Sequence, residues 1–147
     1  MAAAEVSPKP PWHLWVVGVL GLLWNSYGGY DFTMSLTQGE AYYRAVGMSD
    51  AQVSQIAAYP AWMFVVWAIG VWGALLGAVL LLARSKWAAA VFAASLAGFL
   101  MSLVYTYVIS PMRDAGGAMV IMQGIIFAAC VFFVWYAVRA RKAGHLR

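Results

Sequence analysis

The sequence predicts an all-α integral membrane protein, an up-down four-helix bundle that forms a single membrane domain over residues 1–147. The composition is the first reason: 65% of the residues are hydrophobic, only 10% are charged, and the mean hydropathy is +0.78. A soluble domain of this size needs a more polar surface. The second reason is length, because about 20 apolar residues at a rise of about 1.5 Å each cross a bilayer. The apolar runs that reach this length are residues 12–30, 61–83, 87–109 and 116–138.

The basic residues orient these four predicted helices. Two of them, Arg44 and Arg113, fall on one side of the membrane. The other seven fall on the opposite side: Lys9, Arg84, Lys86, Arg139, Arg141, Lys142 and Arg147. Because short cytoplasmic segments are rich in Lys and Arg, both termini are expected in the cytoplasm of a bacterial inner membrane. The long loop 31–60 is then expected on the outer side. The first run lacks the cleavage pattern of a signal peptide, so we expect it to remain as a helix.

The outer loop 31–60 has two helix-start patterns. Residues 37–40 and 49–52 both read as capping boxes, and each precedes a short stretch with an apolar side. We therefore expect two short amphipathic helices separated by Gly47. A lid over an outward-facing pocket and a simple connector both fit this pattern, and the connector is the favoured interpretation.

Small residues recur at helical spacing within the apolar runs. Because small residues let membrane helices approach closely, they are expected to line the interior of the bundle. The GxxxG step at 73–77 would fit a homodimer seam as well. The residues expected to pack the helices are Gly18, Gly21, Gly28, Gly73, Gly77 and Gly98.

A few polar side chains interrupt the apolar runs at a similar expected depth, in the outer half of the membrane. They are Asn25, Ser102 and Gln123, with Tyr105 and Trp24 near the same level. Amides in hydrocarbon are costly unless they find partners, so we expect these groups to meet. The meeting point would be either an interhelical hydrogen-bond cluster or a small polar pocket open to the outside.

Asp31 lies at the outer end of the first predicted helix. Arg44 and Arg113 are the basic residues expected on that side. We expect Asp31 to pair with one of them and so to close the outer rim of the bundle.

Several classes of membrane protein are disfavoured by the residues present. The single cysteine, Cys130, gives no thiol pair for a disulfide oxidoreductase. The two histidines, His13 and His145, lie at the inner edge and do not suit a bis-histidine haem inside the bundle. No catalytic constellation, metal site or cofactor is predicted. The pI of 9.4 is explained by the positions of the basic residues at helix ends, and no nucleic acid is expected as a partner.

Three stretches of the chain resemble a known group of proteins. They are Leu23-Trp24-Asn25 with Gly28 and Asp31, then 60–62 (PAW), then 69–73 (IGVWG) with Gly77. The chain resembles short, uncharacterised proteobacterial inner-membrane proteins that are often labelled sugar transporters, and the resemblance covers most of its length. A weaker similarity is to the DoxX-like four-helix membrane proteins. The acidic residue expected in their second helix is absent, with Trp72 near its place.

Two functions remain after these exclusions. The first is a non-enzymatic accessory or scaffolding component of a membrane assembly, with the lipid bilayer, other membrane subunits or a second copy of the chain as partners. The alternative is a transporter or binding protein for a small, sugar-like solute that acts as an oligomer. A membrane enzyme acting on lipid or quinone is disfavoured, because Cys130 has no acid or base near it in sequence.

Overall fold

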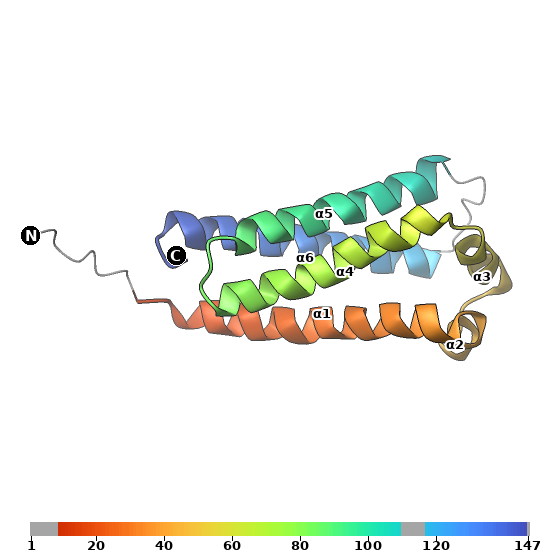
Figure 1. The fold of residues 1–147 in the computed structure, drawn as a ribbon, viewed down its shortest axis with the longest axis horizontal. Helices are drawn as coiled ribbons and strands as arrows, with labels where there is room; N and C mark the ends of the chain where they lie inside the picture. Colours follow the sequence, from red (N-terminus) through yellow and green to blue (C-terminus); the bar gives the residue numbers. More distant parts are fainter. Residues whose placement is uncertain (1–8, 110–116, 147) are drawn as a thin grey trace, which may run out of the picture.

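The computed structural model describes residues 9–109 and 117–146, and within them the chain forms four long helices and a small helical cap. Figure 1 shows the long helices side by side, with the start of α1 and the end of α6 at one end of the bundle and α2 and α3 at the other. We call these the termini end and the cap end. The elements are α1 (Trp12–Gln38), α2 (Glu40–Ala45), α3 (Asp50–Ala57), α4 (Ala61–Leu82), α5 (Ala88–Val104), the π-helical turn η1 (Tyr105–Ile109) and α6 (Gly117–Lys142).

Three of the helices are long and apolar enough to cross a membrane. They are Ala61–Leu82, Ala88–Ile109 and Val120–Lys142, and they agree with the prediction of a helical chain whose helices are long and apolar enough to span a membrane. Helix α1 is long enough but is not among these three, since its aliphatic residues are diluted by Trp, Gly, Asn and Tyr.

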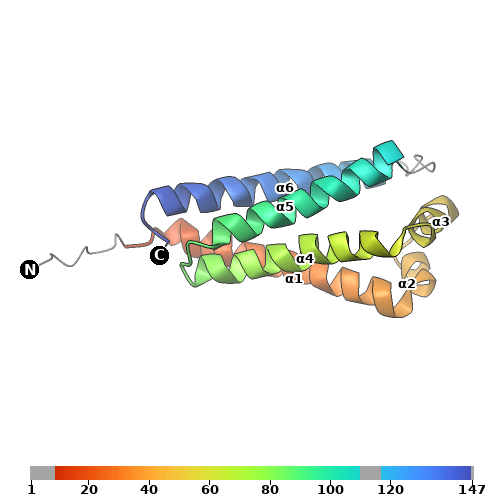
Figure 2. The ribbon, with the colours of Figure 1, turned by 45° about the horizontal axis from the view of Figure 1, so that its top comes forward.

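The long helices pack in a fixed order. Helix α4 contacts both α1 and α5, and α5 contacts α6. In Figure 2, α5 and α6 lie together on one side of the bundle, and α1 and α4 lie together on the other. Helices α4 and α5 are thus the centre of the bundle, and α1 and α6 are its edges.

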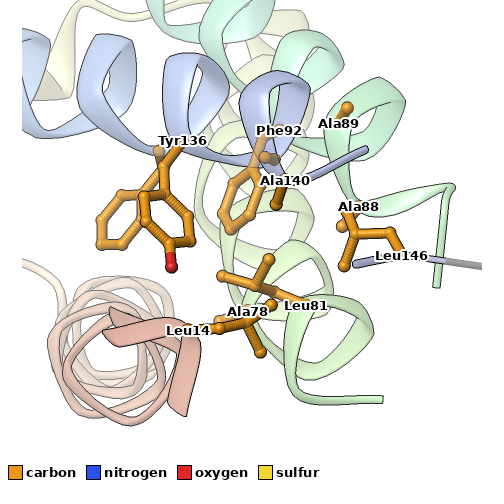
Figure 3. Packing of buried hydrophobic residues seen from close by; sticks show 11 residues of the cluster. Leu14, Ala78, Leu81, Ala88, Ala89, Phe92, Tyr136, Ala140 and Leu146 are labelled. Atoms are coloured by element: carbon orange, nitrogen blue, oxygen red, sulfur yellow. The ribbon is translucent and has the colours of Figure 1, made fainter. Parts of the chain in front are cut away.

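The main apolar core lies toward the termini end, where side chains from all four long helices meet (Figure 3). The Phe92 and Phe133 rings stack there with centroids 5.3 Å apart. Gly77 faces Phe92 so closely that an added Cβ would lie 2.8 Å from the ring. The glycine is therefore what lets the ring lie flat against α4.

The other small residues also face neighbouring helices. An added Cβ on Gly18 would meet Leu82, on Gly21 Phe133 and on Gly28 Val71. On the second side of α4, Gly73 faces Ser95, and Gly98 of α5 faces the Val66 carbonyl. The GxxxG step 73–77 is thus occupied by α5 of the same chain, so the homodimer seam considered for it is not needed to explain these glycines.

Helix α1 is longer than predicted, since the predicted end at Tyr30 is passed by eight residues and the helix ends at Gln38. Thr33, Ser35 and Thr37 donate their hydroxyls to helix carbonyls four residues earlier, which satisfies the polar side chains without leaving the helix. Gly39, with φ 54°, ends it. The predicted capping box at 37–40 is therefore wrong, because Thr37 lies inside α1.

At the cap end, the second predicted capping box, at residues 49–52, is confirmed. The Ser49 hydroxyl accepts from the Gln52 amide, and the Gln52 side chain accepts from the Ser49 amide, so α3 begins as predicted. Gly47, with φ 84°, separates α2 from α3. Side chains of the two short helices share a small core of Tyr42, Tyr43, Val53 and Ile56. The segment 110–115, which joins the predicted helices 87–109 and 116–138, lies outside the described residues.

Candidate functional site

The predicted meeting of polar side chains does not occur, because each group bonds to a neighbour of its own. The Asn25 amide donates to the Gly21 carbonyl at 2.8 Å and to the Ala74 carbonyl at 3.3 Å, which ties α1 to α4. The Ser102 hydroxyl donates to the Phe99 carbonyl of its own helix. The Gln123 side chain accepts from the Tyr107 hydroxyl, which ties α6 to η1.

The two aromatic members of the predicted cluster also lie apart from the amides. Tyr105 packs edge-to-face on Trp62 and on Tyr59, with centroids 5.2 Å and 5.7 Å apart. Trp24 is 44% exposed on the outside of α1. The expected meeting of Asn25, Ser102 and Gln123, as a hydrogen-bond cluster or as a pocket, is therefore contradicted by their separate bonds.

The physical reason is depth. Asn25 bonds to Ala74, and the neighbouring Gly73 faces Ser95 across the α4–α5 contact. Ser102 lies seven residues beyond Ser95 on the same helix, which is about 10 Å nearer the cap end at a rise of about 1.5 Å per residue. The prediction placed Asn25 about as far from the outer end of its helix as Ser102, but α1 continues to Gln38, so Asn25 lies deeper than Ser102.

The predicted rim ion pair is replaced by other bonds. The Tyr42 hydroxyl donates to the Asp31 carboxylate at 2.6 Å. This bond to the carboxylate, together with burial, raises the pKa of Tyr42 well above its ordinary value. Arg44 instead pairs with Glu40 at 2.8 Å and with Asp50 at 2.7 Å, because both carboxylates lie within the cap on either side of it. The Asp31–Arg44 pair is therefore a wrong prediction, and Arg113 lies outside the described residues.

A hollow at the termini end brings together polar and aromatic side chains that lie far apart in the sequence. It has a volume of about 450 Å³ and lies between the first turn of α1 and the last turns of α6. Its lining includes His13, Trp135, Tyr136, Arg139 and His145. We call it the termini-end hollow.

Two bonds hold the walls of this hollow. The His13 ring Nδ1 and the Tyr136 hydroxyl are hydrogen-bonded, which joins α1 to α6. On the other side, Arg84 of the α4–α5 turn donates to the His145 carbonyl at 2.9 Å. Gly144, with φ 79°, reverses the chain after α6, so that His145 returns toward the bundle and Leu146 is buried.

Sequence reasoning missed this hollow because its residues are far apart along the chain. His13 and Tyr136 are separated by 123 positions, so no spacing pattern connects them. The one signal in the sequence was depth in the membrane, because His13 and Arg139 are both expected on its inner side. That signal does not say which helices are neighbours or how the tail after α6 folds back.

Among the described residues, no group of three or more His, Cys, Asp or Glu side chains is placed to hold a metal ion. No family model matches the chain, and no curated protein or solved structure matches it at a significant level.

Proposed function

We propose that this chain is a non-enzymatic accessory subunit of a bacterial inner-membrane assembly, and that it crosses the membrane four times with both termini in the cytoplasm. The observation that carries the proposal is the dispersal of the polar side chains: Asn25, Ser102 and Gln123 each hold helices or backbone together instead of surrounding a solute. These contacts occupy the bundle interior. We therefore expect the protein to act through its outer surfaces, by contact with other subunits.

The span of α1 is supported by its packing. It contacts α4, which is one of the three apolar spans, and its Asn25 bonds to Ala74 in the middle of that helix. A helix packed along a membrane span is expected to share its depth. The orientation follows from the unequal division of basic residues in the sequence.

The exposed face of α6 is the surface on which we expect a partner. Only 17% of the residues in its most apolar segment are buried, against 28% in the corresponding segments of α4 and of α5 with η1. Gly124 and Ala128 are both exposed on this helix, one turn apart, and nothing lies within 4 Å of a Cβ added to Gly124. In lipid, helices associate mainly through close packing, because no hydrophobic force drives them together. A pair of small residues at this spacing allows that close approach. The proposed occupant is therefore a membrane-spanning helix of another subunit.

The proposal is tested by native mass spectrometry on the protein extracted in mild detergent from its own membrane. The expected result is a defined complex with other subunits. Ala128→Leu should disrupt that complex, because the added atoms fill the approach of the partner helix.

Ala94→Leu is the matched control, since Ala94 is an exposed alanine on α5 and the change adds the same atoms. It should leave the complex intact. A bare homo-oligomer that retains a small polar solute would contradict the accessory role and would favour the transporter alternative. Equal loss of the complex in both variants would contradict the docking face on α6.

A further inference from the structure

We propose that the termini-end hollow is a binding site for a phosphate group, with Arg139 as its main recognition residue and the headgroup of an anionic phospholipid as the ligand that its position favours. This inference is independent of the proposed accessory role. It rests on the charge at this end of the molecule, on the free donors of Arg139, and on the level of the hollow within the bundle.

Charge at the two ends of the described chain is strongly unequal. The three acidic residues that the structure describes, Asp31, Glu40 and Asp50, lie at or near the cap end. The described basic residues other than Arg44 lie at the termini end: Lys9, Arg84, Lys86, Arg139, Arg141 and Lys142. The hollow therefore lies in a positive field that attracts anions.

Arg139 is the charged side chain that lines the hollow. Its guanidinium lies over the Trp135 ring, 5.3 Å from the ring centroid. Both ion pairs found among the described residues belong to Arg44, so no described carboxylate neutralises Arg139. Stacking on a ring leaves the N–H edge of a guanidinium available, and that edge matches two phosphate oxygens at once. Trp135 thus holds the side chain in place while its donors stay open.

The walls of the hollow are held before any ligand arrives. Tyr136 is buried, and its bond to His13 fixes the α1 wall. Figure 3 shows the Tyr136 hydroxyl directed toward the α1 side of the core. The tail wall is fixed by the bond from Arg84 to the His145 carbonyl. The histidine rings at both walls add N–H groups that can donate to an anion.

The level of the hollow favours a lipid as the source of the phosphate. Exposed tryptophans lie at this end of the bundle: Trp12 at the start of α1 is 75% exposed, Trp87 before α5 63%, and Trp135, which lines the hollow, 52%. Exposed tryptophans at the end of a membrane bundle mark the level of the headgroups. A phosphate bound beside Arg139 would therefore lie where the phosphates of the bilayer lie.

The test compares lipid binding by native mass spectrometry of the full chain in mild detergent. Phosphatidylglycerol and phosphatidylcholine with the same acyl chains are added separately. The wild-type chain should retain phosphatidylglycerol in preference. Arg139→Gln should lower its affinity about tenfold, the usual effect of losing a hydrogen bond to a charged group. Arg139→Lys keeps the charge but not the planar edge, so its affinity for phosphatidylglycerol should lie between those of the wild type and Arg139→Gln.

Arg141→Gln is the matched control, because it removes the same charge from an exposed residue of the same helix end that does not line the hollow. It should change the affinity less than about twofold. Equal losses in Arg139→Gln and Arg141→Gln would overturn the site and leave only general attraction of anions. Equal retention of the two lipids by the wild-type chain would overturn the anionic phospholipid as the ligand, because both headgroups carry a phosphate and only phosphatidylglycerol has a net negative charge.

A second arm separates the two sources of phosphate. Inorganic phosphate is added to the protein–phosphatidylglycerol complex. If the lipid is retained, the lipid headgroup is the ligand, as we expect. If inorganic phosphate displaces the lipid and itself binds in an Arg139-dependent way, the phosphate site stands but its ligand comes from solution. Circular dichroism of each variant shows whether the helices remain intact.

Discussion

Replacing Gly77 with alanine should loosen the contact between α4 and α5. The added Cβ would lie 2.8 Å from the Cδ1 and Cε1 atoms of Phe92, closer than real Cβ contacts allow. Phe92 is 3% exposed and its ring is stacked at 11° on Phe133, so the ring has no free space into which to turn. Overpacking of this kind costs about 1–3 kcal/mol.

Gly124→Ala is the matched control, because nothing lies within 4 Å of its added Cβ. Both substitutions gain about 1 kcal/mol of helix propensity, so the difference between the two variants isolates the clash. Gly73→Ala should behave like Gly124→Ala, since its Cβ would meet Ser95 at an ordinary 3.4 Å. The two glycines of one GxxxG step are therefore expected to respond differently.

The assay is the free energy of unfolding, measured by titrating sodium dodecyl sulfate into mild-detergent micelles and following tryptophan fluorescence. Gly77→Ala should be less stable than Gly124→Ala by about 1–3 kcal/mol. Equal stability of these two variants would refute the reasoning, because it would mean that the Phe92 ring is not held against α4.

Three further changes test single contacts. Asn25→Ala removes the bond to Ala74 and should lower the free energy of unfolding by about 0.6–2 kcal/mol. In native mass spectrometry the variant should still bind its partner subunits. Loss of partner binding in a fully stable variant would contradict the structural role of Asn25. The bond to Asp31 raises the pKa of Tyr42, so the Tyr42 hydroxyl should contribute stability below pH 10.0, its ordinary pKa, and lose that contribution as the pH rises further. Tyr42→Phe should therefore remove the most alkaline step from a tyrosinate absorbance titration. An unchanged titration would argue against the bond. Ser49→Ala should cost about 0.5–2 kcal/mol of local stability in α3, seen as faster amide hydrogen exchange over Asp50–Ala57 and not in α4; unchanged exchange would mean that the capping box does not hold α3.

The parts of the fold that depend on local pattern could be predicted from the sequence. The apolar runs predict α4 closely, and the Ser49–Gln52 capping box predicts the start of α3. The end of α1 could not be predicted in this way. Thr33, Ser35 and Thr37 are residues typical of loops, yet their hydroxyls bond to carbonyls of the helix they belong to, so α1 projects beyond the apolar run.

The site could be predicted less well, for two physical reasons. The error in the end of α1 became an error in the depth of Asn25, which is why its expected meeting with Ser102 fails. The termini-end hollow depends on contacts across the chain, such as His13 with Tyr136, and on a reversal at Gly144 that brings His145 back to the bundle. Spacing along one helix contains no information about either.

The most direct test of the account is the membrane topology on which both proposals rest. In a Cys130→Ala background, Ser54→Cys places a thiol on the exposed surface of α3, and Ala143→Cys places one after the end of α6. In spheroplasts, a membrane-impermeant maleimide should label Ser54→Cys at once and label Ala143→Cys only after the membrane is permeabilised. Labelling of both thiols, or of neither, in intact spheroplasts would contradict four spans with both termini in the cytoplasm.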